Sequence, residues 1–290
     1  MNREEIEKRL PTEEDIRSFE QNGWYATPQI IPDELLDHAV KGAEAFYAGH
    51  RDFELNTSEK IANSASTESV LKNNEFVSLQ KEEIRQLAFY PLVSATAARL
   101  VGAQEMRLFS DSLICKYPSN GSAKGSIGWH SDKAYWPTCS SDKLITAWIP
   151  FQDCTVEMGT LVHLEGSHLW QNDPELRALI SFNDHKMNDF ESYIEKHRPN
   201  TERKLMLLKK GQVSFHSCLT LHASYPNVSD RNRMALAVHM QDADNTYQKA
   251  WWPDGNPVSI SYDAMCAKDS EGNPDYSDPK LFPVMWTENA

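Results

Sequence analysis

Gly128-Trp129-His130-Ser131-Asp132 places an imidazole and a carboxylate two residues apart in a stretch typical of a strand. In an extended chain, residues i and i+2 leave the same face, so His130 and Asp132 can bind one metal ion together. A second histidine from far along the chain would complete the two-histidine, one-carboxylate arrangement of non-haem iron(II) sites. His222 is the candidate we favour, and His216, six residues earlier and expected on the same strand, is the alternative.

The segments around this stretch form a series of short apolar runs separated by turn residues. They cover residues 106–117, 144–151, 160–164, 205–208, 212–218 and 234–240. Several short strands at such spacing indicate a sandwich or barrel. We therefore predict a mainly β fold with flanking α-helices.

Helical patterns precede and interrupt these strands. Thr12 resembles the cap of a helix over 13–22 that ends at Gly23, and the next helix begins at Pro32 and ends before Gly49. A third pattern extends from Glu82 to Leu100, and a polar one from 173 to 197 interrupts the strands. We expect the first helices to pack on the core and the last to be an insertion on its rim.

Residues 51–80 are polar and lack clear periodicity. Long segments of this kind within a compact domain are often lids or binding loops. We predict a covering loop over the core here.

The charge balance argues against several kinds of partner. The 290 residues include 29 basic and 42 acidic ones, for a formal net charge of −13, and no stripe of Lys or Arg occurs. Nucleic acid and anionic membranes are therefore excluded as partners. The first twenty residues are too charged for a signal peptide, and no apolar run is long enough to span a bilayer.

The five cysteines are odd in number and scattered, without a Cys-x-x-Cys pair. This usage favours reduced thiols over a disulfide framework or a zinc knuckle. Together with the charged start of the chain, it predicts a cytoplasmic protein. We expect a monomer.

A second motif follows His222. Arg233 stands eleven residues later, after a turn that contains Pro226 and Asn227, and begins an apolar segment. If His222 ends one strand and Arg233 begins the next, both side chains point into one cavity. An arginine there can bind a carboxylate through two parallel hydrogen bonds. Arg231 is the alternative to Arg233, but it lies in the predicted turn, where exposure to solvent is the simpler explanation.

The combination of His130-x-Asp132, His222-x-Ser224, Pro226-Asn227-x-Ser229 and Arg233, with Gly166-Ser167-His168 between, resembles the phytanoyl-CoA dioxygenase family of iron(II)/2-oxoglutarate oxygenases. The resemblance covers roughly residues 105–242. It implies a double-stranded β-helix (jelly-roll, cupin-like) core. We accordingly expect a single oxygenase domain over 1–290, with amino-terminal helices in 1–104, the core over about 105–245 and a tail over 246–290.

The resemblance also implies roles for individual residues. The iron ligands correspond to His130, Asp132 and His222, and Arg233 corresponds to the arginine that pairs with the distal carboxylate of 2-oxoglutarate. Further cosubstrate contacts correspond to Ser224, Trp148 and Ser112.

The implied reaction is that of an oxidoreductase of the dioxygenase class. It consumes O₂ and 2-oxoglutarate, releases succinate and CO₂, and hydroxylates a substrate carbon, with ascorbate as reductant in vitro. Glu165 and Ser131 depart from residues usual in the family, and neither is a metal ligand. Related iron halogenases replace the carboxylate ligand by Ala or Gly, so Asp132 argues against halogenation.

The expected substrate is a small molecule in a natural-product tailoring step of secondary metabolism. The acidic balance favours a cationic or zwitterionic one. An acyl-CoA or lipid 2-hydroxylase is the alternative, disfavoured because no basic cluster is present to bind CoA phosphates. A cupin-like metal sensor and a zinc hydrolase are the alternatives of other classes.

Several residues carry weaker expectations. Lys133, Tyr135 and Trp136 follow the metal motif and are candidates for the entrance of the pocket, and Trp251 and Trp252 are candidates for closing it. In each case plain packing or solvation is the alternative.

The sequence also predicts structural roles for three further histidines. His168 is predicted to be structural, because a buried imidazole can satisfy backbone groups at a tight turn. His163 and His239 are predicted to lie in strands with local partners.

Overall fold

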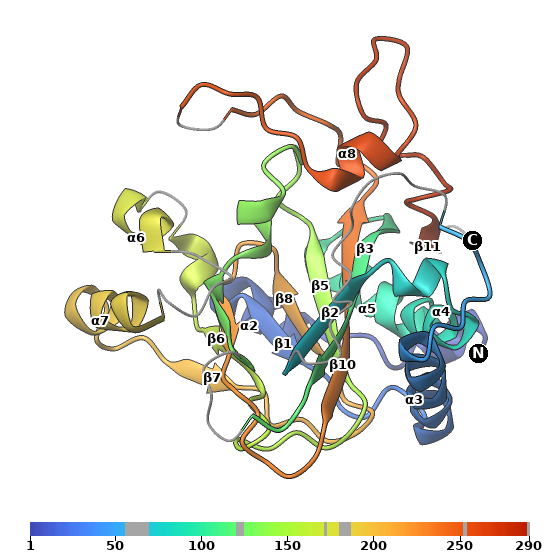
Figure 1. The fold of residues 1–290 in the computed structure, drawn as a ribbon. Coiled ribbons are helices and arrows are strands. Elements are labelled where there is room, and N and C mark those ends of the chain that lie inside the picture. Colours follow the sequence, from blue (N-terminus) through green and yellow to red (C-terminus); the bar gives the residue numbers. More distant parts are fainter. Residues whose placement is uncertain (56–69, 120–124, 171–172, 180–186, 252–253, 289–290) are drawn as a thin grey trace.

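Two antiparallel β-sheets form the centre of the molecule, with helices outside them (Figure 1). The computed structural model describes residues 1–55, 70–119, 125–170, 173–179, 187–251 and 254–288. The predicted fold class, mainly β with flanking helices around a double-stranded β-helix, is confirmed.

The large sheet has its strands in the order β1-β8-β5-β10-β3-β11, and β2 also pairs with β3. Their bounds are β1 Trp24–Ala26, β8 Ser214–Ser217, β5 Ile145–Pro150, β10 Arg233–Asp242, β3 Glu105–Lys116, β11 Val284–Thr287 and β2 Leu71–Glu75. The small sheet has the order β4-β9-β6-β7, with β4 Ile127–His130, β9 His222–Ser224, β6 Leu161–Leu164 and β7 Arg203–Leu205.

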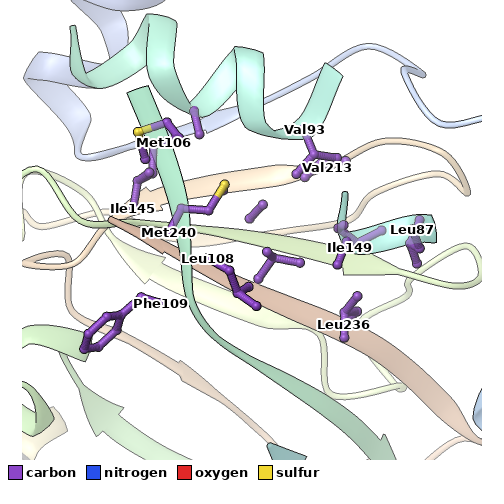
Figure 2. Close-up of a cluster of buried hydrophobic side chains, with 14 of the residues drawn as sticks. Leu87, Val93, Met106, Leu108, Phe109, Ile145, Ile149, Val213, Leu236 and Met240 are labelled. Atoms are coloured by element: carbon purple, nitrogen blue, oxygen red, sulfur yellow. The ribbon is translucent and has the colours of Figure 1, made fainter. Parts of the chain in front are cut away.

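Alternation along the strands of the large sheet separates a helix-covered face from an inner face. On β10, Leu236 and Val238 belong to the main hydrophobic core, whereas Ala235 and Ala237 belong to a second cluster that includes Leu161 of the small sheet. Figure 2 shows part of the main core, with side chains from β3, β5 and β10 beside Val93. Because side chains alternate along a strand, residues beside the core positions face the small sheet.

Helices from the amino-terminal part cover the outer face of the large sheet (Figure 1). They are α1 Arg3–Glu7, α2 Glu13–Asn22, α3 Asp33–Tyr47, α4 Glu82–Ala88 and α5 Pro91–Val101. The predicted helices over 13–22 and from Pro32 are confirmed. Thr12 forms a capping box with Asp15, and Gly23 ends α2 in the left-handed region with φ of 80°.

The helical pattern predicted from Glu82 to Leu100 is confirmed, but the chain divides it into two helices, α4 and α5. Tyr90 is extended, and Pro91 occupies the first turn of α5. Proline lacks the N–H that would continue a helix and disfavours a helical residue before it. Pro91 therefore ends one helix and begins the next.

The outer face of the small sheet is covered by the predicted insertion. It contains α6 Pro174–Leu179 and α7 Met187–His197. Phe190 and Ile194 of α7 pack with Trp129 of β4 and Leu221, which precedes β9. The helical interpretation of residues 173–197 is confirmed where the structure describes them.

The predicted covering loop over 51–80 is partly wrong. Residues 71–75 form β2 and residues 77–79 a short 3-10 helix, η1, while 56–69 lie outside the described residues. The large sheet thus takes strands from both sides of the predicted core, because β1 and β2 precede residue 105 and β11 follows 245. In Figure 1 the carboxy-terminal helix α8, Ser261–Met265, lies beyond one end of β5, β10 and β3.

Among the described residues, no helix has the length and apolar character needed to cross a bilayer.

Candidate metal and cosubstrate site

A cavity between the two sheets brings together all seven residues that the sequence predicted for the site. It is lined from the large sheet, the small sheet, β2 and the segment around α8. The seven residues are His130, Asp132, His222, Arg233, Ser224, Trp148 and Ser112.

Three side chains of this cavity have their ligand atoms directed at one point. His130 ends β4 and His222 begins β9, and the two pair across the small sheet. Oδ1 of Asp132 lies 3.9 Å from Nε2 of His130 and 3.5 Å from Nε2 of His222. These three residues, all buried, form the group among the described residues that can hold a metal ion.

The strand expected through Asp132 stops short of it. Ser131 is extended, with φ of −110° and ψ of 146°, and Asp132 then begins the 3-10 helix η3, Asp132–Tyr135. One extended residue between His130 and Asp132 is enough to bring both side chains to the same side.

Backbone carbonyls determine which ring nitrogen of each histidine faces the centre. Nδ1 of His130 lies 2.7 Å from the carbonyl of Gly128, and Nδ1 of His222 lies 2.9 Å from that of Thr220. A carbonyl only accepts, so each Nδ1 carries the proton and each Nε2 presents its lone pair. The donor set is therefore two neutral imidazole nitrogens and one carboxylate oxygen, which suits iron(II).

Electrostatics favour the same protonation states. Burial lowers the pKa of His130, and it lowers the pKa of His222 to about 4. Burial alone would raise the pKa of the Asp132 carboxyl, but the adjacent imidazoles of His222 and His216 hold it well below its usual range. Near neutral pH the site thus holds two uncharged imidazoles and a carboxylate, ready to bind a divalent cation.

The second oxygen of Asp132 is held by the large sheet. Oδ2 accepts a hydrogen bond of 2.6 Å from the hydroxyl of Thr146 on β5. That hydroxyl also contacts Nδ1 of His239 on β10 at 2.8 Å. Because these groups fix Oδ2, they orient Oδ1 toward the two histidines. Sequence reasoning did not find Thr146, although its place between core residues of a strand shows that it faces inward.

The expectation that His216 and His222 share a strand is wrong. His216 lies on β8 of the large sheet and His222 on β9 of the small sheet, with a turn between them. Nε2 of His216 lies 3.3 Å from Oδ2 of Asp132, whereas Nε2 of His222 is nearest to Oδ1. The position of His216 is that of a residue supporting Asp132.

His163 differs from its prediction as well. It lies in β6 and is fully buried, but within the described part of the chain neither ring nitrogen has a hydrogen-bond partner. Its ring instead stacks on Trp24 at 6.3 Å and lies 4.9 Å from the ring of His216. His239, by contrast, has the expected partner on the next strand.

Arg233 is buried in the cavity with hydrogen-bonding capacity unused. Only 1% of it is exposed, and among the described residues its Nε and Nη2 have no acceptor. Its guanidinium lies 5.5 Å from the ring centre of Trp148, within range of a cation–π contact. A buried guanidinium with two donor nitrogens unused fits an anionic ligand such as a carboxylate. Arg231 instead lies at the surface beside Asp230.

Lys116 is a site residue that sequence reasoning missed. It is fully buried at the end of β3 and pairs in register with Arg233. Its Nζ donates to the hydroxyl of Ser224 at 2.7 Å and to the carbonyls of Ser224 and Tyr225. Since the Ser224 oxygen accepts from Lys116, its own proton is available to donate to an acceptor in the cavity. A lysine within an apolar strand was the available signal.

The candidates for substrate contact divide into two groups. Tyr135 and Trp136 line the cavity. Lys133 instead donates to the carbonyls of Cys139 and Ser141 and pairs with Asp142 at 3.0 Å. Its role is to hold its own loop.

The two remaining candidates lie in the tail. Trp251 does not line the cavity and is 62% exposed, and Trp252 lies outside the described residues. His168 contacts the carbonyl of Glu20 through Nε2 at 2.9 Å, which joins its turn to α2.

A double-stranded β-helix with two histidines and a carboxylate at its centre, and a buried arginine beside them, defines the class of iron(II)/2-oxoglutarate oxygenases. The sequence profile of the family described as Phytanoyl-CoA dioxygenase (PhyH) matches residues 19–235. The chain belongs to this family.

Two curated relatives illustrate the similarity in sequence. Human peroxisomal phytanoyl-CoA dioxygenase is 23% identical over 255 residues, which span 83% of this chain and 72% of the human protein. The Bos taurus enzyme of the same name is 26% identical over 247 residues, which span 81% of this chain and 69% of the Bos taurus protein.

Two solved structures illustrate the similarity in fold. The alpha-ketoglutarate-dependent carbocyclase SnoK from nogalamycin biosynthesis superposes with a TM-score of 0.67 at 22% identity, over 94% of this chain and 96% of SnoK. EctD from S. alaskensis, solved with 2-oxoglutarate and 5-hydroxyectoine, superposes with a TM-score of 0.61 at 17% identity, over 87% of this chain and 86% of EctD.

Proposed function

We propose that this oxygenase hydroxylates a small molecule in a natural-product tailoring step, using iron(II) held by His130, Asp132 and His222. The observation that carries the proposal is the convergence of three ligand atoms in the cavity that also holds Arg233, whose Nε and Nη2 have no acceptor among the described residues. When bound, the iron supplies the activation of O₂ that no protein side chain can provide.

The residues of the chain have separate tasks in this proposal. His130 and His222 bind through Nε2 because their Nδ1 protons are held by backbone carbonyls. Arg233 and the hydroxyl of Ser224 bind the distal carboxylate of 2-oxoglutarate, with Trp148 and Ser112 as further contacts. Both sheets shield the site from bulk water, which strengthens these polar interactions.

The proposed role in natural-product metabolism is supported by similarity in fold. SnoK and the epimerase SnoN, which superposes with a TM-score of 0.63 at 19% identity, both come from nogalamycin biosynthesis, and EctD was solved with 5-hydroxyectoine. The proposal includes a cytoplasmic monomer and ascorbate as reductant in vitro.

An acyl-CoA hydroxylase is the second candidate, favoured by the curated relatives named for phytanoyl-CoA. Arg233 is the only Lys or Arg among the described residues that line the cavity, and we assign it to 2-oxoglutarate. CoA would require further basic groups for its phosphates. Turnover of phytanoyl-CoA, measured as succinate release, would select this candidate.

The test is anaerobic titration of the metal-free protein with iron(II) and then 2-oxoglutarate, followed by the visible metal-to-ligand band. We expect the band in the wild type and in His216→Ala, and its loss in His222→Ala, because only His222 is proposed as a ligand. A wild-type protein that binds iron without developing the band would contradict the cosubstrate assignment. A band lost in His216→Ala but kept in His222→Ala would contradict the ligand assignment.

A further inference from the structure

A second buried cation lies next to Arg233 in the interior of the protein. Lys116 ends β3 and is fully buried, and it pairs in register with Arg233, which begins β10. Arg233 lines the cavity. Lys116 is not among the lining residues, but it contacts one of them, Ser224, through its side chain. Any influence of Lys116 on a bound ligand therefore passes through Ser224.

The amine of Lys116 is surrounded by three oxygen atoms, and none of them is charged. Its Nζ donates to the hydroxyl of Ser224 at 2.7 Å, to the carbonyl of Ser224 at 2.9 Å and to the carbonyl of Tyr225 at 2.7 Å. An ammonium has three N–H groups, one for each of these oxygens. Burial and the charge of Arg233 lower the pKa of Lys116, and a carboxylate bound nearby would act in the opposite direction.

The backbone of Lys116 fixes the same region. Its carbonyl accepts a hydrogen bond of 3.0 Å from Nδ2 of Asn227, which is fully buried and also donates to the carbonyl of Arg231 at 2.6 Å. The side chain of Lys116 thus holds the end of β9, while its backbone holds the turn that leads to Arg233. Both segments that carry the proposed contacts to the distal carboxylate are attached to one residue of β3.

We propose that Lys116 is a positioning residue for the cosubstrate, and that its ammonium, acting through Ser224, makes the site select 2-oxo acids that have a distal carboxylate. The inference rests on the proposed function, because it concerns the 2-oxoglutarate that this function requires. Since Lys116 donates to the Ser224 oxygen, the Ser224 proton is left for the ligand, and a carboxylate accepts it. Two buried cations without an anion are unfavourable, and the carboxylate supplies the missing charge.

Lys116 has one alternative role, as an uncharged strut that closes the turn between β9 and β10. A neutral amine has two N–H groups and one lone pair, so it would donate to the two carbonyls and accept the proton of the Ser224 hydroxyl. That proton would then be used within the protein and not for the ligand. Removal of a neutral amine would therefore leave the preference for a distal carboxylate unchanged or increase it.

The experiment compares 2-oxoglutarate with 2-oxopentanoate, which has the same five-carbon chain and a methyl group in place of the distal carboxylate. Anaerobic titration of the iron(II)-loaded protein, followed by the visible band, gives the Kd of each acid. The ratio of the two Kd values is the readout, because a general loss of structure weakens both acids alike. We expect the wild type to prefer 2-oxoglutarate on the order of 100-fold, and Lys116→Met to lower this preference about tenfold.

Lys81→Met is the matched control, because it also removes a buried lysine. Lys81 is 6% exposed, pairs with Asp52 and Glu83 and does not line the cavity. Its loss should leave the ratio of the two Kd values unchanged.

A double-variant cycle tests whether Lys116 acts through Ser224. Ser224→Ala removes the hydroxyl that Lys116 orients, so the two substitutions affect the same hydrogen bond to the ligand. In the Ser224→Ala background, Lys116→Met should lower the preference by less than about threefold, since effects of residues in contact are not additive. An undiminished tenfold effect in that background would overturn the action through Ser224.

The inference as a whole is overturned if Lys116→Met prefers 2-oxoglutarate as strongly as the wild type or more strongly. An equal loss of preference in Lys81→Met would overturn it as well. The band shows that the metal site of each protein is formed, and Lys116→Gln replaces Lys116→Met if the latter develops no band. Absence of the band from the wild type would instead overturn the proposed function.

Discussion

The two ends of the cavity are built in different ways. At the metal end, each proposed ligand lies at the end of a strand or two residues beyond it and is oriented by a nearby backbone carbonyl or by Thr146. Where β2 and α8 line the cavity, Glu75 and Tyr262 are 187 residues apart and are joined through their side chains. The metal end thus depends on strand and backbone geometry, whereas the other end depends on a contact between side chains distant in sequence.

This difference indicates which part of the molecule can vary. A residue on the inner face of the large sheet is fixed by strands on both sides, so replacing it disturbs several contacts. The other end depends on β2, a strand of the large sheet that pairs with β3, and on α8, which lies beyond one end of β5, β10 and β3. Changes there should leave the metal in place.

Among the variants considered, Arg233→Met should have the largest effect, on the binding of 2-oxoglutarate at the metal end. Loss of a buried, charge-assisted pair should weaken 2-oxoglutarate binding on the order of 100-fold, or about 3 kcal/mol. The measurement is the Kd of 2-oxoglutarate from the visible band at saturating iron(II). Arg231→Met, at the surface, should change this Kd less than about twofold. Equal effects in the two variants would remove Arg233 from the cosubstrate site.

Lowering the pH should destabilise the metal-free protein, because its buried histidines are kept uncharged by the fold. Burial lowers the pKa of both His216 and His222 to about 4, against about 6.5 in the unfolded chain. Between these values the unfolded chain binds more protons, so the free energy of unfolding of the metal-free protein falls as the pH is lowered from 6.5 to 4. Each histidine contributes roughly 3 kcal/mol to this loss. Asp111 opposes it in part, because burial raises its pKa to about 6.

Denaturant unfolding of the metal-free protein at several pH values measures this dependence. His216→Gln removes one of the titrating groups, so its stability should fall less steeply with acid than that of the wild type. Parallel pH profiles for the two proteins would show that His216 is not held neutral by the fold.

Thr146→Val tests whether the large sheet orients Asp132. The variant keeps the shape of the side chain but removes the hydrogen bond to Oδ2, so iron(II) affinity should fall about 10- to 100-fold. Anaerobic titration against a chelator gives the affinity. Thr160→Val is the control, because its hydroxyl bonds to the carbonyl of Met206 and not to Asp132. An iron affinity that is unchanged in Thr146→Val would refute this role.

Tyr262→Phe should have the smallest effect, limited to the contact between β2 and α8. It removes one hydrogen bond to Glu75, so the free energy of unfolding, measured with denaturant, should fall by about 1 kcal/mol. Titration with iron(II) and 2-oxoglutarate should be unchanged. If those two affinities fell as well, the ends of the cavity would not be independent.

Much of the metal end could be predicted because its signals are local. His130 and Asp132 are separated by one residue, and Arg233 stands at the start of an apolar run. The start of α2 could be predicted in the same way, because its capping box lies within four residues of sequence. The prediction that His216 and His222 lie on one strand was wrong. The chain passes from the large sheet to the small sheet between these two residues, and the hydrophobic pattern does not show such a crossing.

By itself, the sequence determined the class of fold, the ends of several helices and the pair His130 and Asp132, because each depends on residues close together along the chain. His222 lies far from this pair in sequence and was assigned from its spacing to Arg233, which matches a known family motif. Only the tertiary structure decided that Lys116 supports Ser224, that Thr146 holds Asp132, and that Glu75 meets Tyr262. These contacts join strands and helices that are far apart in sequence. Their formation depends on strand register and on the packing of peripheral elements, which local patterns do not encode.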